Sequence, residues 1–249
     1  MDRIKQSLVV FLLISGSLNS CIAQEADTKA FNDQKNTDKI YTFQEGDPNG
    51  IGKWYMGREI AYVMGFQGID WLERSEREKE EQTSLLIKNM DIQPTDVIAD
   101  IGAGSGYHVF KMAPLAKYGQ VYAVDIQQEM LDAINSQKKE NRIDNVQLIK
   151  GEEQTTNLPH NKIDKILMVD VYHEFSYPKE MLESMHSALN DNGVIYLIEY
   201  RMEDPKVPIK IIHKMTEQQA VKEFEANGFQ LVENIDNLPW QHCMVFRKD

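Results

Sequence analysis

Short apolar runs alternate with amphipathic stretches over most of the chain. From about residue 91, mostly apolar runs predict strands, and between several of them apolar residues recur at helical spacing. The predicted strands cover residues 96–101, 120–126, 145–151, 164–171, 193–201, 229–236 and 242–249. The predicted helices cover residues 106–117, 127–140, 178–190 and 216–228.

This alternation of strands and helices predicts one α/β domain over residues 91–249. Strands separated by helices favour a parallel sheet that is covered on both faces. The last two strands have no helix between them, so we expect them to form an antiparallel hairpin. The predicted fold is therefore doubly wound, with a mostly parallel seven-stranded sheet and a C-terminal antiparallel hairpin.

The segment 51–90 differs in pattern and precedes this domain. Residues 54–68 are rich in aromatic residues and methionine, and they could close over a site as a lid or form part of the core. Ser75 with Glu78 matches a capping box, followed by apolar residues. We therefore predict a helical extension or lid over residues 51–90.

The N-terminus has the pattern of a targeting signal. Arg3 and Lys5 precede a short apolar run, and small residues precede Cys21, which predicts a signal peptide over residues 1–20. The run "LNSC" resembles a bacterial lipobox with Cys21 as the lipidated residue, although Asn19 fits that pattern imperfectly.

Other interpretations of this leader are cleavage after Ala23 and an uncleaved apolar helix. Residues 21–50 are polar and predict a tether. The expected location is the bacterial envelope, either lipid-anchored through Cys21 or periplasmic. The alternative is the cytoplasmic face of the inner membrane.

The net charge and the number of cysteines argue against a nucleic-acid partner and against a zinc knuckle or disulfide framework. The 249 residues include 27 Lys and Arg against 39 Asp and Glu, a formal net charge of −12. Proteins that clamp a nucleic-acid backbone present basic surfaces, so we expect no nucleic-acid partner. Two cysteines, Cys21 and Cys243, are too few for a zinc knuckle or a disulfide framework.

A glycine-rich loop follows the first predicted strand of the domain. Gly102, Gly104 and Gly106 have the spacing G-x-G-x-G, whereas the dinucleotide fingerprint would place a glycine at Tyr107. In open α/β sheets, such loops lie at the carboxyl ends of the strands, where ligands bind.

Two acids flank this loop. Asp100 precedes it, and its carboxylate would repel a pyrophosphate but favour a cofactor that carries an ammonium and a sulfonium. Asp125 ends the second strand, where an acid can accept both ribose hydroxyls. A phosphate-free nucleoside with a cationic amino-acid end, S-adenosylmethionine, fits these features.

The segments "VIADIGAGSG" and "VYAVDI" resemble those of the class I S-adenosylmethionine-dependent methyltransferases, over about residues 75–249. The resemblance implies that the loop lies under the methionine and ribose, Asp100 holds the amino end, Asp125 binds ribose and Ile126 packs on adenine. It also implies an acid near the adenine amino group, for which Glu152 and Glu153 both remain candidates. The implied cofactor contacts are Asp100, Gly102, Ala103, Gly104, Gly106, Asp125, Ile126, Glu152, Glu153 and Asp170.

The segment "DVYHEF" at residues 170–175 should lie at the mouth of the site. Asp170, Tyr172 and His173 are the catalytic candidates there, and His173 is the best base because its pKa suits neutral pH. The alternative is a packing role for His173. The family members that methylate nucleobase amines carry Asn/Asp-Pro-Pro-Tyr/Phe at this motif, which "DVYH" lacks.

Residues 199–216 follow the fifth strand, a frequent place for substrate loops. Arg201 could clamp a carboxylate or phosphate there, or the loop could simply be solvated. His173, Glu174, His213 and His242 show no metal-ligand spacing, so we predict no metal site.

Together, these features predict an enzyme that transfers a methyl group from S-adenosylmethionine to a small-molecule acceptor. The cofactor is made in the cytoplasm, which conflicts with export. A non-catalytic nucleoside-binding lipoprotein with a methyltransferase-like fold is therefore the alternative. The acceptor atom and the oligomeric state are left open by the sequence.

Overall fold

A computed structural model describes residues 40–249, of which Phe43–Asp249 belong to one compact unit. The predicted signal peptide, the lipidation site Cys21 and the tether up to residue 39 lie outside the described residues. Within the described part of the chain, no helix is long and apolar enough to cross a membrane.

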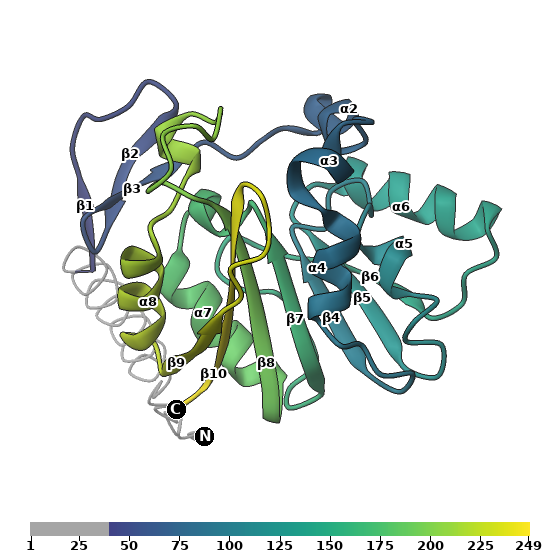
Figure 1. The fold of residues 1–249 in the computed structure, drawn as a ribbon. Coiled ribbons are helices and arrows are strands. Elements are labelled where there is room, and N and C mark those ends of the chain that lie inside the picture. The colour runs from purple at the N-terminus through teal and green to yellow at the C-terminus, as the bar shows by residue number, and fades with distance from the viewer. Residues whose placement is uncertain (1–39) are drawn as a thin grey trace, which may run out of the picture. The chain divides into compact units, whose positions relative to one another are not determined.

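One seven-stranded sheet forms the centre of this unit (Figure 1). Its strands are β4 (Val97–Ile101), β5 (Gln120–Asp125), β6 (Val146–Lys150), β7 (Ile163–Val169), β8 (Leu189–Tyr200), β9 (Phe229–Asn234) and β10 (Gln241–Lys248). They lie in the order β6-β5-β4-β7-β8-β10-β9. The first five are parallel, and β10 is antiparallel to both β8 and β9, which confirms the predicted sheet and hairpin.

Helices cover both faces of the sheet (Figure 1). They are α4 (Thr83–Asn89), α5 (Val109–Met112), α6 (Gln128–Glu140), α7 (Pro178–Ala188) and α8 (Glu217–Glu225). Successive strand residues point to opposite faces. Ile98 of β4 therefore lies in the cluster that includes Ile87 and Met112, whereas Ala99 lies in the cluster that includes Leu182 and Phe224.

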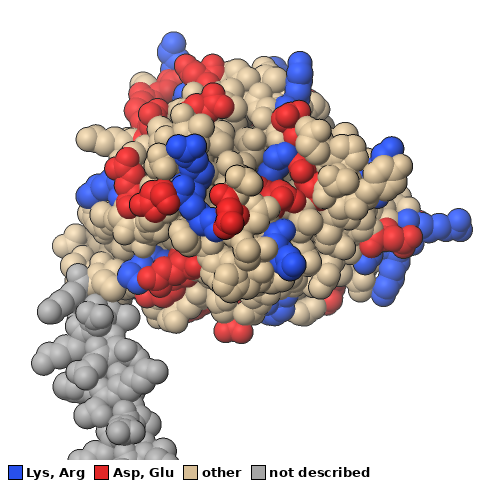
Figure 2. Space-filling model, turned by 90° about the horizontal axis from the view of Figure 1, so that it is seen from below, with Lys and Arg blue, Asp and Glu red and all other residues tan. Residues whose placement is uncertain are grey.

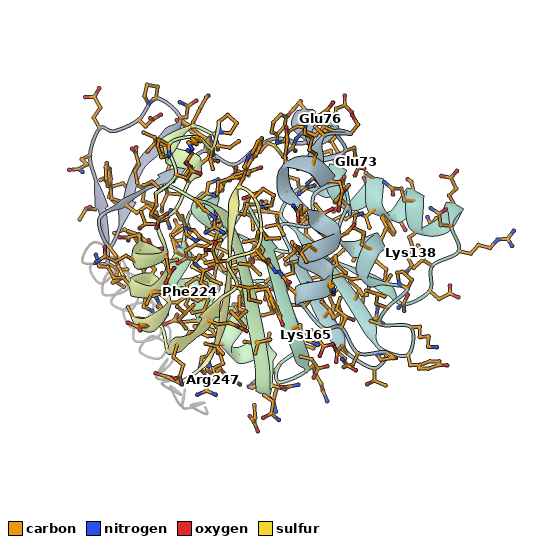
Figure 3. The ribbon with its side chains drawn as sticks, viewed as in Figure 1. Glu73, Glu76, Lys138, Lys165, Phe224 and Arg247 are labelled. Atoms are coloured by element: carbon orange, nitrogen blue, oxygen red, sulfur yellow. The ribbon has the colours of Figure 1, made fainter. Side chains whose placement is uncertain are left out.

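The packing of α8 shows how one helix covers the antiparallel edge. Phe224, which Figure 3 labels, is fully buried. Its ring stacks on Phe246 of β10 with 4.1 Å between centroids. The helix begins at Thr216, whose hydroxyl accepts a hydrogen bond from the amide of Gln219. Gly228, with a φ of 79°, follows its end, as predicted for a left-handed helix terminus.

The segment 51–90, predicted to be a helical extension or lid, is not helical in its first part. It begins with an antiparallel hairpin of β2 (Gly50–Tyr55) and β3 (Arg58–Ala61), and a short strand, β1 (Tyr41–Phe43), lies within the predicted tether. The hairpin turns at Met56 and Gly57, both with positive φ. Four short helices follow: η1 (Phe66–Gly68), α2 (Ile69–Leu72), α3 (Arg77–Glu81) and α4.

The helical stretch over residues 75–90, whose start the Ser75–Glu78 capping box predicts, is broken in two. Gln82 adopts a left-handed conformation with a φ of 49°, which separates α3 from α4. Glu78 accepts a hydrogen bond from the amide of Ser84 at 3.1 Å, so it caps α4 instead of pairing with Ser75.

The helix predicted over residues 106–117 is also shorter than expected, and regular helix there is confined to α5. The helix ends at Met112, two residues before Pro114, which has no amide hydrogen to donate to a helical carbonyl.

Candidate active site at the carboxyl ends of the strands

A cavity of about 450 Å³ opens at the carboxyl ends of the parallel strands. It spans the point between β4 and β7 where the strand order reverses, which is where such sheets bind ligands. A more open hollow beside α8 shares no lining residue with it. The lining of the cavity includes Gly102, Gly104, Asp125, Ile126, Glu152, Glu153, Asp170, His173, Glu174 and His213.

The glycine loop brings bare backbone to the cavity wall. Gly102 and Gly104 have φ values of 73° and 54°, which favour glycine. A Cβ atom on Gly102 would lie 2.4 Å from Val171 Cγ2, and one on Gly104 would lie 2.6 Å from Leu72 Cδ1. The glycines therefore permit a tight turn and close approach to neighbouring elements.

Two residues of the loop do not line the cavity, contrary to the implied cofactor contacts. Ala103 is buried, and Gly106 donates its amide to the carbonyl of Ala103 at 2.8 Å. The hydrogen bond between Ala103 and Gly106 stabilises the turn, and Gly102 and Gly104 are the loop glycines that line the cavity.

Asp125 and Ile126, the expected nucleoside edge, lie at the end of β5 and line the cavity. The two carboxylate oxygens of Asp125 accept the amides of Gly104 at 2.9 Å and Gln127 at 2.8 Å. Burial raises the pKa of Asp125, and these backbone hydrogen bonds oppose the rise. Ile126 is 40% exposed and supplies an apolar surface to the cavity. Glu152 and Glu153 both line this edge, so the choice between them stays a prediction.

Two acids lie at the ends of the neighbouring strands β4 and β7. Asp100 is buried and does not line the cavity, although the next residue, Ile101, does, whereas Asp170 is partly buried and lines the cavity. Asp170 Oδ2 accepts a hydrogen bond from Gln241 Nε2 at 2.6 Å. The other oxygens, Asp100 Oδ2 and Asp170 Oδ1, have no hydrogen-bond partner within residues 40–249.

Burial raises the pKa of Asp100 to about 7 and that of Asp170 well above its ordinary value. Glu81 and Glu199 raise the pKa of Asp170 further. Buried carboxylates with unpartnered oxygens suit a cationic ligand, because a nearby positive charge favours their ionised form. This part of the site therefore fits the ammonium of S-adenosylmethionine.

At the other end of the cavity, the buried acid Glu199 fixes the orientation of His173. Its Nδ1 lies 2.7 Å from Glu199 Oε2, and its amide donates to Glu199 Oε1 at 3.2 Å. Glu199 is fully buried in β8. Burial is the largest single effect and lowers the pKa of His173, but the charge and hydrogen bond of Glu199 together with the charge of Glu174 outweigh it, so the net shift is upward.

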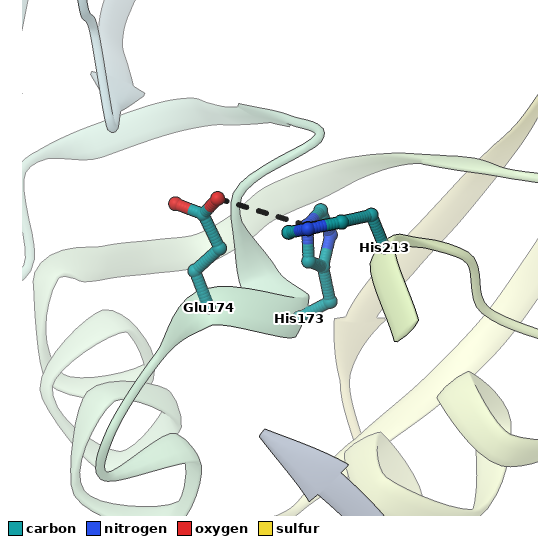
Figure 4. Close-up of side chains that lie close together, drawn as sticks. All are labelled: His173, Glu174 and His213. Carbon is teal, nitrogen blue, oxygen red and sulfur yellow. Dashed lines mark hydrogen bonds and ion pairs between the residues drawn. The ribbon is translucent and has the colours of Figure 1, made fainter. Parts of the chain in front are cut away.

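Two further side chains meet His173 (Figure 4). His213, from the short helix η3 (Ile211–His213), places its Nδ1 3.1 Å from His173 Nε2. Glu174, beside His173 on η2 (Tyr172–Glu174), places Oε1 3.9 Å from the same nitrogen, and burial raises the pKa of Glu174 to about 7. A metal site was not predicted from the sequence, but these three residues lie together.

Other candidates from the sequence lie elsewhere. Tyr172 was expected at the mouth of the site, but it is fully buried and does not line the cavity. Its hydroxyl donates a hydrogen bond to Glu223 Oε2 at 2.8 Å. Arg201 pairs with Asp236 at 2.8 Å and does not line the cavity. His242 bonds Glu203 at 2.9 Å, away from His173.

A polar group on the extension was not predicted from the sequence. Arg77 and Glu81 of α3 line the cavity and pair at 2.7 Å, and Tyr200 of β8 donates to Glu81 at 2.9 Å. The run "SEREKEEQ" gave no signal for this role, because a charged helical stretch is usually solvated. Tertiary contacts bury Arg77 and Glu81 instead.

Comparison with known proteins agrees with this geometry. Residues 92–243 match the family model described as a methyltransferase domain. An uncharacterized methyltransferase of Bacillus subtilis, YdaC, is 26% identical over 144 residues, which cover 58% of this chain and 77% of that protein. A protein-L-isoaspartate O-methyltransferase of Thermosipho melanesiensis is 27% identical over 114 residues, covering 45% of this chain and 54% of that protein.

Solved structures share the fold. The crystal structure of a methyltransferase from Aquifex aeolicus, described as S-adenosylmethionine-dependent, superposes with a TM-score of 0.69 at 20% identity, covering 74% of this chain and 98% of that one. The family model spans more than half of the present chain. The chain therefore belongs to the methyltransferase-domain family and is an S-adenosylmethionine-dependent methyltransferase.

Proposed function

We propose that this enzyme methylates a small-molecule acceptor that binds beside His173, Glu174 and His213. The observation that carries the proposal is that one cavity joins the nucleoside edge at Asp125 to this histidine-rich end. Its volume of about 450 Å³ lies within the range of about 300–1,000 Å³ that small-ligand pockets occupy.

The bound cofactor supplies a methyl group on a positively charged sulfur. In this proposal, the Asp125 carboxylate accepts hydrogen bonds from the ribose hydroxyls, while Ile126 packs against adenine. Asp170 and Asp100 stabilise the cationic end, since each retains an unpartnered carboxylate oxygen. These contacts fix the cofactor so that the reacting carbon faces the rest of the cavity.

At the acceptor end of the cavity, the imidazole of His173 is the proposed base. Glu199 fixes one ring nitrogen of His173, which leaves Nε2 directed toward His213 and the cavity. In this proposal, His173 receives the proton that the acceptor loses. The raised pKa of His173 supports that role, because it strengthens the imidazole as a base.

A small acceptor also agrees with the charge on the molecule. The face shown in Figure 2 carries acidic and basic side chains interspersed, without a continuous basic area. The overall charge of −12 points the same way, because nucleic-acid partners require positive surface.

The test uses the full chain with labelled S-adenosylmethionine and fractionated small-molecule extracts. We expect labelled methyl transfer into a small-molecule fraction, and calorimetric binding of S-adenosylmethionine but not NAD. His173→Gln should reduce transfer about 100-fold or more, whereas the exposed His160→Gln should not. Cofactor binding without transfer would favour the non-catalytic alternative, and no binding would exclude both.

We also propose attachment to the bacterial envelope through lipidated Cys21. Arg3, Lys5 and the apolar run before "LNSC" support this proposal. Fractionation of the expressed full chain should place it with membranes, and Cys21→Ala should release it while cofactor binding persists. Equal membrane association of both forms would instead indicate an uncleaved anchor. A fully cytosolic wild type would contradict the proposal.

A further inference from the structure

Three potential metal-ligand atoms converge at the acceptor end of the cavity. His173, Glu174 and His213 each offer one donor atom, and these atoms all lie within 4.8 Å of one another. All three side chains line the cavity. Figure 4 shows His173 and Glu174 on one turn and His213 approaching from a separate segment.

The spacing of the donors suits a divalent ion. Zinc lies about 2.0–2.2 Å from imidazole nitrogen and carboxylate oxygen, so its ligands are separated by roughly 3–3.5 Å. His173 Nε2 lies 3.1 Å from His213 Nδ1 and 3.9 Å from Glu174 Oε1. The Glu174 oxygen lies beyond this range, so its carboxylate must move toward the two imidazoles to complete the site.

The surroundings of His173 strengthen the assignment. Metal-binding histidines usually donate their second ring nitrogen to a carboxylate, which fixes the tautomer and orients the ring. Glu199 provides this contact to His173 Nδ1 at 2.7 Å from a fully buried position in β8. The hydrogen bond between His173 and His213 does not require a carboxylate on His173 Nδ1, whereas a metal-binding histidine is stabilised by one.

We propose that His173 Nε2, His213 Nδ1 and the Glu174 carboxylate bind a divalent transition-metal ion, with Glu199 as a positioning residue. Two imidazoles and one carboxylate favour zinc or iron(II) over magnesium or calcium, which prefer oxygen ligands. Three protein ligands leave coordination positions open toward the cavity, as in catalytic metal sites.

The ion would select the acceptor. Open positions beside a hard or borderline ion favour a small molecule with two neighbouring oxygen donors, at least one of them a hydroxyl, such as a vicinal diol or a 2-hydroxy acid. This inference rests on the proposed function and changes one role within it. The Nε2 lone pair holds the ion, and the ion makes an acceptor hydroxyl acidic, so that its proton passes to water.

The experiment titrates the full chain, first stripped with a chelator, with Co²⁺, followed by competition with Zn²⁺. We expect saturable binding of one ion per chain, seen as visible Co²⁺ absorption that Zn²⁺ removes. His213→Ala and Glu174→Gln should each weaken binding at least about tenfold. The matched controls His160→Ala and Glu183→Gln, at exposed positions, should bind as the wild type does.

Glu199→Gln tests the positioning role separately. It should weaken Co²⁺ binding about 10–100-fold and alter the absorption spectrum, while a merely structural role would leave the spectrum of bound Co²⁺ unchanged. A cooperative thermal unfolding transition and a far-ultraviolet circular dichroism spectrum like those of wild type should show that His213→Ala and Glu199→Gln are folded.

The two proposals fail in different ways. A wild type that binds S-adenosylmethionine but shows no saturable Co²⁺ or Zn²⁺ site would overturn the metal site alone. Equal ion affinity in wild type and His213→Ala would do the same. A wild type that binds Co²⁺ at this site but not S-adenosylmethionine would contradict the proposed function instead.

Discussion

At Asp125, one carboxylate connects the proposed ribose contact to the glycine loop. It accepts the amides of Gly104 and Gln127, so its removal affects the loop as well as any ribose contact. Hydrogen bonds to a charged group contribute about 1.5–3 kcal/mol each. Asp125→Ala should therefore weaken S-adenosylmethionine binding at least about tenfold, as measured by calorimetry.

The matched control is Asp132→Ala, at an exposed position on α6. It removes a carboxylate without touching the cavity, so its affinity for the cofactor should equal that of wild type. An Asp125→Ala protein that melts cooperatively and binds the cofactor normally would remove Asp125 from the site.

Gly102 combines two constraints that can be separated by experiment. Its φ is 73°, and a Cβ atom there would meet Val171. Gly57 has a φ of 98°, but a Cβ atom there would meet no atom within 4 Å. Gly57→Ala should cost about 1–3 kcal/mol from backbone strain alone.

Gly102→Ala should cost more than Gly57→Ala in chemical denaturation, because steric overlap adds to the same strain. It should also weaken cofactor binding, since the loop must move. Equal costs for the two variants would show that the loop accommodates a side chain.

Among the elements, α8 shows most directly how a helix stabilises the sheet edge. Phe224 is fully buried against Phe246 and Phe229. Phe224→Ala should lower the free energy of unfolding by about 3–5 kcal/mol. Val232→Ala, on the half-exposed edge strand β9, should change it by about 0.5 kcal/mol or less. Similar losses in both variants would contradict this account of the packing.

The helices of the extension show where sequence patterns fail at this scale. The apolar and polar spacing over residues 75–90 is consistent with one helix, yet Gln82 takes a left-handed conformation. The break places Arg77 and Glu81 at the cavity, where Glu81 accepts the Tyr200 hydroxyl. A contact between residues 119 positions apart decides this geometry, and no local pattern can encode it.

For the molecule as a whole, buried acids link stability to pH. Burial raises the pKa of Asp100 to about 7, the Arg77 charge lowers it, and Asp125 raises it. Between about pH 4 and 7, the folded chain therefore keeps a proton that the unfolded chain has released. The contribution of Asp100 to the free energy of unfolding should fall as pH rises through this range.

Asp100→Asn cannot ionise, so it tests this linkage. At pH 8 it should be more stable than wild type by about 1 kcal/mol or more, which corresponds to a rise in melting temperature of about 2–4 °C. At pH 5 the two proteins should differ less. The variant should also bind S-adenosylmethionine more weakly at pH 8, because it lacks the carboxylate. An equal melting difference at both pH values would contradict the raised pKa.

The sequence by itself determined the sheet, the hairpin and which strand-end residues lie beside the glycine loop. These features depend on local information: alternating strand and helix patterns, glycines at fixed spacing, and acids at strand ends. The carboxyl ends of parallel strands meet at one edge, so local position was enough to bring Gly102, Asp125 and Asp170 to one cavity.

Only the tertiary structure decided which side chains lie around His173, where we propose that the acceptor binds. His173, Glu199 and His213 come from separate segments, and their donor atoms meet only because β7 and β8 pair and the chain folds back through η3. Likewise, burial removed Tyr172 from the site and brought in Arg77. Side-chain burial and long-range contacts depend on packing between elements, so spacing along the chain did not predict them.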